Sequence, residues 1–458
     1  MRWNLSYSYL SLPDVFYTLQ GVSPVSGPLR GFFNYALARE LGLGQPDDGD
    51  WAILAGCAIP VNARPFSQAY AGHQYGHFTM LGDGRALVLG EQRAIDGTLN
   101  DLQLKGSGPT PYSRNGDGRA ALGPMLREYL MGEAMHALGI PTTRALAVVE
   151  TGETLRRQTL APGAVLTRVA HSHLRVGTFE FAAALEDQDG LHSLVNYALA
   201  RHFSPRAGAT NPAAALLEGV ISAQARLVAQ WMAVGLVHGV MNTDNMTLSG
   251  QTIDYGPCAF LDAYRVNQVF SSIDHNGRYS YGNQPGIAQW NLTRLAEALL
   301  PAMAQPLVNG FATLYQGHYN RLMAAKLGLK EGEGSAELVA ELLTWMEDTG
   351  ADYTSTFRKL TDTLDLPGAP EGWLQRWRAA FQKNGNPSAM AQSNPIYIPR
   401  NRLVQTALDA AEAGDYGPFQ TMLEVVKFPF DVRPGLEAYA TPPTHDETTE
   451  PFITYCGT

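Results

Sequence analysis

Two patterns of hydrophobic and polar positions divide the chain near residue 180. Between residues 50 and 180, short runs of β-like alternation are separated by glycine-rich turns and enclose one segment of helical period, Ala121–Leu138. Gly139 and Pro141 follow this segment and mark its end. The pattern predicts a small sheet that carries a single helix. The β-like runs are ALVLGEQ (86–92), LQLKG (102–106), RALAVVET (144–151) and AVLTRVA (164–170).

Beyond residue 181 the apolar positions recur mainly three and four residues apart, which is typical of helices that bury one face. Residues 239–261 are the exception, because NTDNMTLSG, QTID and YGPCAFLD predict a loop, a strand and a turn. A polar loop set among helices is a common place for catalytic residues. The predicted helices are Leu216–Gly235, Asn291–Met303, Glu337–Met346, Leu374–Phe381 and Leu403–Ala413.

These two patterns predict an α/β (α+β) fold with two lobes. We expect a β-rich lobe with one central helix over residues 1–180, and a large, mostly helical lobe over residues 181–458. The second lobe would display a catalytic and metal-binding loop at residues 238–256 and end in a C-terminal tail.

Composition and charge narrow the classes of function. Hydrophobic residues make up 45% of the 458 residues and charged residues 17%, which indicates a globular protein. The net charge of −10 provides no general attraction for a nucleic acid or an anionic membrane, so any phosphate contact must be local. Three cysteines and the lack of a signal-like N-terminus predict a cytoplasmic protein. The longest apolar stretch, Leu227–Met241, falls short of the roughly 20 residues that a membrane span needs.

A glycine turn and a strand lysine are the first candidates for nucleotide binding. Gly82, Gly84 and Arg85 lead into the run ALVLGE, and glycines there allow a phosphate to approach the backbone, although a plain hairpin turn is favoured when this segment is taken by itself. Lys105 follows Gly82 by 23 residues on an alternating strand. In kinase-like folds such a lysine binds phosphates and pairs with a helix glutamate. Glu128 and Glu133 are the candidate partners, and a solvated edge lysine is the alternative.

Two further segments carry charges suited to phosphate. Asp117 and Gly118 lie in SRNGDGR, which is either an exposed loop or a polar flap that touches the nucleotide. Arg168 and Arg175 are seven residues apart, and their guanidinium groups suit bidentate binding of phosphate, with a surface pair as the alternative.

The segment HGVMNTDN, followed nine residues later by Asp254-Tyr255-Gly256, has the spacing of a kinase catalytic loop and metal-binding motif. Val240 occupies the place of the catalytic base and cannot accept a proton, which leaves Asp244 as the available carboxylate. Asn245 and Asp254 provide hard oxygen ligands for Mg²⁺ or Mn²⁺. A simple turn is the alternative for the four residues 242–245.

His73 and His77, four apart, have glycines around them that argue against a helical metal site, and His171 and His173 are interpreted as polar neighbours of Arg168.

Taken together, these motifs resemble the selenoprotein O family of kinase-like proteins, in particular a cysteine-containing bacterial member. The likeness extends over nearly the whole chain. The segments that carry it are residues 66–91, 102–149, 166–181, 238–264 and 394–401, with Cys456 third from the end.

The resemblance implies a protein adenylyltransferase that transfers AMP from ATP to Ser, Thr or Tyr hydroxyls of other proteins. Transfer of UMP from UTP with Mn²⁺ is a second candidate reaction, and the chain itself is a candidate substrate. The resemblance also implies that ATP is bound in an orientation flipped relative to kinases and that Glu128 forms an ion pair with Lys105. Asp244 would be the catalytic proton acceptor, with Asn245 and Asp254 on the metal. The implied nucleotide-binding residues are Gly82, Gly84, Arg85, Lys105, Asp117, Gly118, Arg168 and Arg175.

Two alternatives and one possible redox site remain open from the sequence. The loss of the usual base at Val240 also fits a non-catalytic nucleotide-binding scaffold, and the motif spacing fits an ordinary phosphotransferase that uses the γ-phosphate. The resemblance implies that Cys456 could bond a cysteine after the Asp-x-Gly motif. Cys258 is the candidate, although a buried and inert Cys258 fits its apolar surroundings better.

Overall fold

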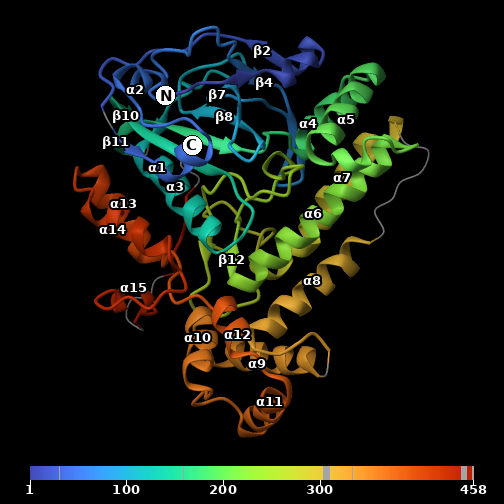
Figure 1. Ribbon diagram of the computed structural model, residues 1–458, viewed down its shortest axis with the longest axis vertical. Helices are drawn as coiled ribbons and strands as arrows, with labels where there is room; N and C mark the ends of the chain where they lie inside the picture. Colours follow the sequence, from blue (N-terminus) through green and yellow to red (C-terminus); the bar gives the residue numbers. More distant parts are fainter. Residues whose placement is uncertain (30, 158, 303–309, 333, 445–450, 456–458) are drawn as a thin grey trace.

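The computed structural model describes residues 1–458 except residues 30, 158, 303–309, 333, 445–450 and 456–458. Figure 1 shows the sheet at one end of the molecule, a cluster of helices at the other, and the long helix α6 crossing between them. This mixed α/β architecture confirms the predicted fold class. The predicted boundary between residues 180 and 181 falls inside helix α4 (Val176–Ala184), so the exact division of the lobes stays a prediction.

The core of the first lobe is a nine-stranded antiparallel sheet with the strand order β2-β4-β7-β8-β11-β10-β3, to which β1 and β9 add at the sides. All four predicted runs lie in its central strands β7, β8, β10 and β11, which confirms them. The strands are β1 Leu5–Ser6, β2 Tyr17–Leu19, β3 Phe32–Phe33, β4 Phe66–Gln68, β7 Ala86–Arg93, β8 Leu99–Lys105, β9 Ala120–Ala121, β10 Arg144–Arg156 and β11 Leu160–Ala170.

Side-chain alternation decides which residues of the sheet face the interior of the molecule. Leu102 and Leu104 of β8 pack in one hydrophobic cluster with helices α1 (Tyr35–Glu40) and α2 (Asp48–Leu54). Gln103 and Lys105 therefore point to the opposite face, because successive side chains of a strand alternate. That opposite face is covered by helix α3. The strand thus delivers a lysine into the space between sheet and helix.

Helix α3 (Leu122–Ala137) is the predicted central helix, and it is buried along nearly its whole length. Strands β10 and β11 cover one side, and helices α13 and α14 from the far end of the chain cover the other (Figure 1). Gly123 N donates to Glu412 Oε1 at 3.0 Å, and the rings of Phe32 and Phe419 lie 4.8 Å apart. Because both sides are covered, α3 can bury charged residues that an exposed helix would show to solvent.

The second lobe is helical, and the five predicted helices are confirmed as α6, α7, α9, α11 and α13, although the predicted end at Met303 lies outside the described residues. Helices α4, α5, α8, α10, α12, α14 and α15 were not predicted. The helices are α5 Gln188–His202, α6 Pro212–Val234, α7 Gln284–Leu299, α8 Phe311–Lys326, α9 Ser335–Thr349, α10 Tyr353–Thr363, α11 Glu371–Asn384, α12 Pro387–Ser393, α13 Asn401–Glu412, α14 Gly417–Val426 and α15 Glu437–Ala440.

The predicted loop between residues 239 and 261 is present, but the strand within it lies elsewhere than expected. The strand pair is β12 (Leu236–Val237) with β13 (Ala259–Phe260), and only Thr252 of QTID pairs, by an isolated bridge to Thr142. Asp254 adopts a φ of 66°, which interrupts an extended conformation at this point. The remaining described strands, β5 (Ala71–Gln74) and β6 (His77–Met80), form one short hairpin. Among the described residues, no helix combines the length and the apolar character that crossing a bilayer requires.

One lysine of the helical core is buried without an acidic partner. Lys326 of α8 is 2% exposed, and in the described part of the chain no carboxylate forms an ion pair with it. Its ammonium lies 4.4 Å from the ring centre of Phe357 and 5.5 Å from that of Tyr353. Burial lowers the pKa of Lys326 to about 7. The folded protein therefore holds a lysine that loses its proton near neutral pH.

This lysine predicts a pH dependence of stability. Between its folded pKa of about 7 and its ordinary value of 10.5, the unfolded chain binds more protons than the folded one, so the free energy of unfolding rises with pH. At ~1.4 kcal/mol per pH unit, the rise from pH 7 to pH 9 is about 2 kcal/mol. Lys326→Met should lack this component. Urea unfolding of both proteins at the two pH values measures it, and parallel changes in the two would contradict the prediction.

Candidate active site

Four charged side chains from four elements meet between the sheet and α3. Lys105 Nζ donates to Glu128 Oε2 of α3 and to Asp254 Oδ1, both at 2.5 Å. Arg168 of β11 donates from Nη1 to Glu128 Oε1 at 3.0 Å. Two cations and two carboxylates balance, which is the condition under which charges can be buried. The structure therefore brings together Lys105, Glu128, Arg168 and Asp254, and it selects Glu128 over Glu133 as the partner of Lys105.

Electrostatics keep both carboxylates of this cluster ionised. Burial by itself would raise the pKa of Glu128, but the Lys105 ammonium and the Arg168 guanidinium outweigh it and lower that pKa. Burial would likewise raise the pKa of Asp254, but Lys105 and Arg168 outweigh it and hold that pKa well below its ordinary value. The Asp254 side chain remains 33% exposed, so its carboxylate also reaches the cleft.

Asp83, which the sequence analysis did not single out, anchors the glycine turn to this cluster. Its Oδ2 accepts from Gln68 N at 3.0 Å and from Gln103 Nε2 at 3.2 Å, and Gln103 Oε1 accepts from Arg168 at 2.6 Å. Burial raises the pKa of Asp83. The signal in the sequence was the aspartate between Gly82 and Gly84, which is easily interpreted as an ordinary turn residue.

Arg175 is buried at the start of α4, behind the cleft. Its guanidinium donates to the carbonyl of Asp244 at 3.2 Å, lies 4.3 Å from the ring centre of Tyr70 and approaches Asp83 to 4.0 Å. Its Nη2 is buried without a hydrogen-bond partner. Arg175 thus connects the glycine turn with the loop that carries Asp244.

Asp244 lies in a short 3₁₀ turn, Thr243–Asn245. Gly72 of β5 and Gly177 of α4 allow these two elements to pack closely around this turn. A side chain at Gly72 would collide with the Asp244 carboxylate, and one at Gly177 would collide with the carbonyl of Ala71. Asp244 Oδ2 accepts from Gln74 Nε2 at 3.4 Å, whereas Oδ1 is buried and has no hydrogen-bond partner. Burial, partly offset by Arg175, raises the pKa of Asp244 to about 6. A buried, unpaired carboxylate oxygen is suited to accepting a proton.

Asn245 and His238 fix the loop around Val240. Asn245 Nδ2 donates to the carbonyl of Val240 at 3.0 Å. This hydrogen bond uses the amide nitrogen of Asn245 and not its amide oxygen. The ring Nε2 of His238 lies 2.9 Å from the carbonyl of Ile253, next to Asp254. The histidine therefore connects the loop of Asp244 and Asn245 to the segment of Asp254.

A cavity of about 500 Å³ opens between the glycine turn and residues 112–119. The predicted site residues on its wall are Gly82, Gly84, Arg85, Asp117, Gly118 and Asp244. Lys105, Arg168 and Arg175 lie deeper and are not part of the wall. Tyr112, which was not predicted, packs against Gly82, where a side chain would collide with its ring. The cavity joins the predicted phosphate turn to the predicted proton acceptor.

The Asp117 carboxylate is already engaged at the rim of this cavity. Arg157 donates to both of its oxygens at 2.9 Å, and Arg119 N donates to Oδ1 at 2.9 Å. Gly118 has a φ of 67° and packs so tightly on Gly108 that no side chain fits. The role of Asp117 and Gly118 in binding a nucleotide stays a prediction, and the contacts show an ordered flap that Arg157 holds in place.

The structure does not bring the predicted metal ligands to one cavity wall. Asp244 lines the cavity of about 500 Å³, whereas Asn245 lines a separate cavity of about 10 Å³ beside Met241 and Thr247, and Asp254 is on the wall of neither. Carboxylate and amide oxygens are preferred by Mg²⁺ and Mn²⁺. Among the described residues, no cluster of three or more His, Cys, Asp or Glu side chains has the arrangement of a metal site, so substrate oxygens and water would have to complete the coordination.

The histidines and cysteines have structural partners. His73 Nδ1 lies 2.5 Å from Glu180 Oε1, and His173 Nδ1 lies 3.2 Å from Asp101 Oδ2. Cys258 is fully buried, and burial raises the pKa of its thiol to about 11. Cys456 lies outside the described residues, so its redox role stays a prediction. Thr454 nonetheless donates to the carbonyl of Pro257 at 2.7 Å, so the tail passes beside the Cys258 segment.

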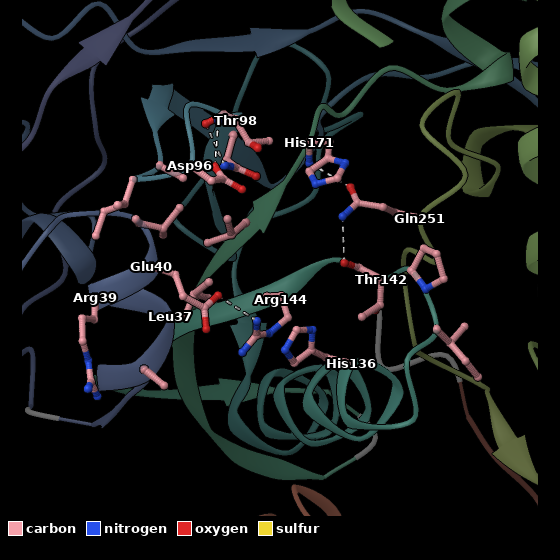
Figure 2. Close-up of a pocket in the computed structure, with 18 of the residues that line it drawn as sticks. Leu37, Arg39, Glu40, Asp96, Thr98, His136, Thr142, Arg144, His171 and Gln251 are labelled. Carbon is pink, nitrogen blue, oxygen red and sulfur yellow. Dashed lines mark hydrogen bonds and ion pairs between the residues drawn. The ribbon is translucent and has the colours of Figure 1, made fainter. Parts of the chain in front are cut away.

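A larger cavity, of about 1040 Å³, lies away from this chemistry (Figure 2). Its walls come from α1, the C-terminal end of α3 and the start of β10, with His136, Arg144 and His171 on its surface. Volume alone does not identify an active site, and in the described part of the chain none of the predicted site residues lines this cavity. Predicted site residues line the smaller cavity instead.

Comparison with known proteins gives a consistent result. The family model described as "Protein adenylyltransferase SelO" matches residues 3–427. The chain is 49% identical to a protein nucleotidyltransferase YdiU of Bacillus cereus (strain AH187) and 50% identical to one of Alkaliphilus metalliredigens (strain QYMF). In both cases the alignment covers 100% of this chain and 98% of the relative.

A solved structure, ROP2 from Toxoplasma gondii, is described as a virulence factor with a protein-kinase fold and no enzymatic activity. It is similar over 76% of this chain and 86% of its own, at 11% identity and a TM-score of 0.26. A TM-score this low establishes no shared geometry.

The two glutamates of α3 provide a matched pair of variants. Glu128→Gln removes the partner of Lys105 and Arg168, and should weaken ATP binding about tenfold, or ~1.4 kcal/mol. Lys105→Met should weaken it at least as much. Glu133→Gln removes an equally buried partner, that of Arg144 at 2.5 Å, but should leave ATP affinity unchanged. Calorimetric titration with ATP measures the affinity, and thermal unfolding checks that both variants lose similar stability. Equal ATP affinity in all proteins would contradict the assignment.

Proposed function

The chain belongs to the SelO family of protein adenylyltransferases, and from this premise we propose that its cleft transfers AMP from ATP to a Ser, Thr or Tyr hydroxyl of a protein substrate. One observation carries the proposal: Asp244 lines the same cavity as the glycine turn, and one of its two carboxylate oxygens is buried without a hydrogen-bond partner. A proton acceptor and a phosphate-binding turn in one cavity are what nucleotidyl transfer to a hydroxyl needs.

The basic residues support the binding of a triphosphate. Arg85 lies on the cavity wall, and Gly82 and Gly84 leave the backbone of the turn accessible to a phosphate. Lys105 and Arg168 lie behind it, held by Glu128, and would bind the β- and γ-phosphates. Arg175 lies behind the cavity wall, with its Nη2 4.0 Å from Asp83, and would add positive charge to this region. In this arrangement the α-phosphate faces Asp244.

The reaction then proceeds by in-line attack on the α-phosphorus. The substrate hydroxyl oxygen forms a bond to this phosphorus, and its proton passes to the unpaired oxygen of Asp244. The bond between the α-phosphorus and the bridging oxygen to the β-phosphate breaks, and pyrophosphate leaves with that electron pair. Lys105 and Arg168 stabilise the charge that develops on the pyrophosphate. Because Asp244 follows the usual position of the base by four residues, Val240 need take no part in the chemistry.

We assign Asn245 and Asp254 as the residues that would hold Mg²⁺ or Mn²⁺. A divalent ion there would supply Lewis-acid stabilisation of phosphate charge. UTP is a second donor that the resemblance implies. We also propose that the lobes divide at residues 1–180 and 181–458. The protein would act in the cytoplasm and would modify itself as well as other proteins.

The proposal predicts that Asp244→Asn retains ATP binding but loses at least about a hundredfold in transfer of label from α-labelled ATP to protein, because the amide cannot accept the proton. Asp189→Asn changes an exposed carboxylate of α5 and should match the wild type. Parallel reactions with γ-labelled ATP should label no protein. Intact-mass analysis of the modified protein identifies the added group as AMP or phosphate.

Two results would contradict this assignment. Wild-type rates of AMP transfer in Asp244→Asn would remove Asp244 from the mechanism. Label from the γ-phosphate but not from the α-phosphate would show an ordinary kinase reaction instead.

A further inference from the structure

A second cavity, of about 710 Å³, lies directly beside the nucleotide cavity. Its walls come from the β5–β6 hairpin, residues 273–278 and the start of α7. Consecutive hairpin residues line the two cavities, since Gln74 is on the wall of the nucleotide cavity and Tyr75 is on the wall of the second one. We call this second cavity the hairpin groove. A polypeptide that places a hydroxyl at Asp244 would lay its neighbouring residues over the hairpin and into this groove.

The hairpin groove is joined rigidly to the loop of Asp244. Asn242 Oδ1 accepts from Tyr75 N at 3.1 Å and from the Tyr279 hydroxyl at 2.6 Å. The rings of Tyr75 and Tyr279 lie 5.0 Å apart. One amide oxygen of the catalytic loop therefore holds both walls of the groove. The position of a side chain bound there would be set relative to Asp244.

Arg278 supplies the groove with a cation that lacks an acidic partner. Its guanidinium lies 4.7 Å from the ring centre of Trp290 and 5.6 Å from that of Tyr279, and it stands against Gly76 of the hairpin. In the described part of the chain no carboxylate forms an ion pair with it, and its Nε is buried without a hydrogen-bond partner. Stacking fixes the plane of the guanidinium and leaves its edge to bind a ligand.

The one carboxylate on the groove wall is occupied by the backbone. Asp274 is 5% exposed, and its two oxygens accept from the backbone N–H groups of Arg278 and Tyr279 at 2.9 and 2.8 Å. It shapes the turn that presents Arg278 and does not pair with the guanidinium. His77 and His275 add imidazole groups at the exposed rim.

A second arginine on the same tryptophan shows what is unusual about Arg278. Arg294 lies 4.8 Å from the ring centre of Trp290, but it also pairs with Glu297 at 2.7 Å, and it is not on the groove wall. Both arginines therefore stack on Trp290. Only Arg278, which faces the groove, does so without a carboxylate partner among the described residues. The free partner position suits a carboxylate from another molecule.

We propose that the hairpin groove binds an acidic side chain, Asp or Glu, of the protein substrate close in sequence to the modified hydroxyl. Arg278 would pair with its carboxylate, and the exposed Ile273 on the groove wall would contact neighbouring apolar atoms. This inference rests on the proposed function, since the groove adjoins the cavity in which the hydroxyl reacts. Arg278 is on this view a residue that determines substrate specificity.

The test uses the full chain, α-labelled ATP and synthetic peptides with one central Ser, Thr or Tyr, in which each flanking position is set in turn to Asp, Asn or Lys. The wild type should show a kcat/KM about tenfold higher for Asp than for Asn at one or two positions. Arg278→Glu should lose this preference and favour Lys at the same positions, with KM for ATP unchanged. Arg278→Gln should be indifferent to charge. Arg294→Glu, the matched control, should behave as the wild type.

The possible outcomes separate the inference from the function on which it rests. Peptide labelling without any preference for Asp, or an unchanged preference in Arg278→Glu, would overturn the inference and leave the proposed function standing. A uniform loss of activity on all peptides in Arg278→Glu, together with a raised KM for ATP, would show that Arg278 only holds the hairpin in place. No AMP transfer to any peptide or protein by the wild type would overturn both.

Discussion

The buried contact of Lys105 with Glu128 and Asp254 is the interaction on which the rest of the structure depends. Burying four charges is costly unless all of them are paired, so each element must be in place before the others are stable. Strand β8 supplies the lysine, α3 the glutamate, β11 the arginine and the loop after β12 the aspartate. The cluster thereby couples the sheet to the catalytic loop, and it keeps the cations at the depth where a triphosphate would end.

Asp244, the proposed proton acceptor, is positioned by a different principle, which is the absence of side chains at neighbouring glycines. Gly72 and Gly177 allow β5 and α4 to approach the turn of Asp244 more closely than any other residues would permit. The β5–β6 hairpin, which contains Gly72, contributes Gln74 to the cavity beside the glycine turn and Tyr75 to the hairpin groove. One two-stranded element therefore contributes both to the placement of Asp244 and to the surface on which a substrate would lie.

Alternation and periodicity were sufficient to predict the central strands, α3 and five helices of the second lobe, because these elements bury one regular face. The spacing of Lys105, Glu128 and Asp254 also indicated residues that prove to be in contact. Asp83, Gln74 and Tyr112 were missed, since their roles arise from contacts between segments far apart in the chain. Nor could the sequence show that Arg175 points behind the cleft or that Asp117 is held by Arg157. Such pairings depend on tertiary packing, which leaves no local pattern.

The cover that α13 and α14 place over α3 has a consequence for biosynthesis. Helix α3 is complete at residue 137, yet the helices that shield its outer side begin only at residue 401. At typical translation speeds the ribosome needs roughly tens of seconds to make the intervening polypeptide. Until then the helix bearing Glu128 has an uncovered apolar side, which is a natural binding site for chaperones. All four members of the charge cluster precede these helices in the chain, so Lys105, Glu128, Arg168 and Asp254 can be synthesised and paired while the outer side of α3 is still waiting for its cover.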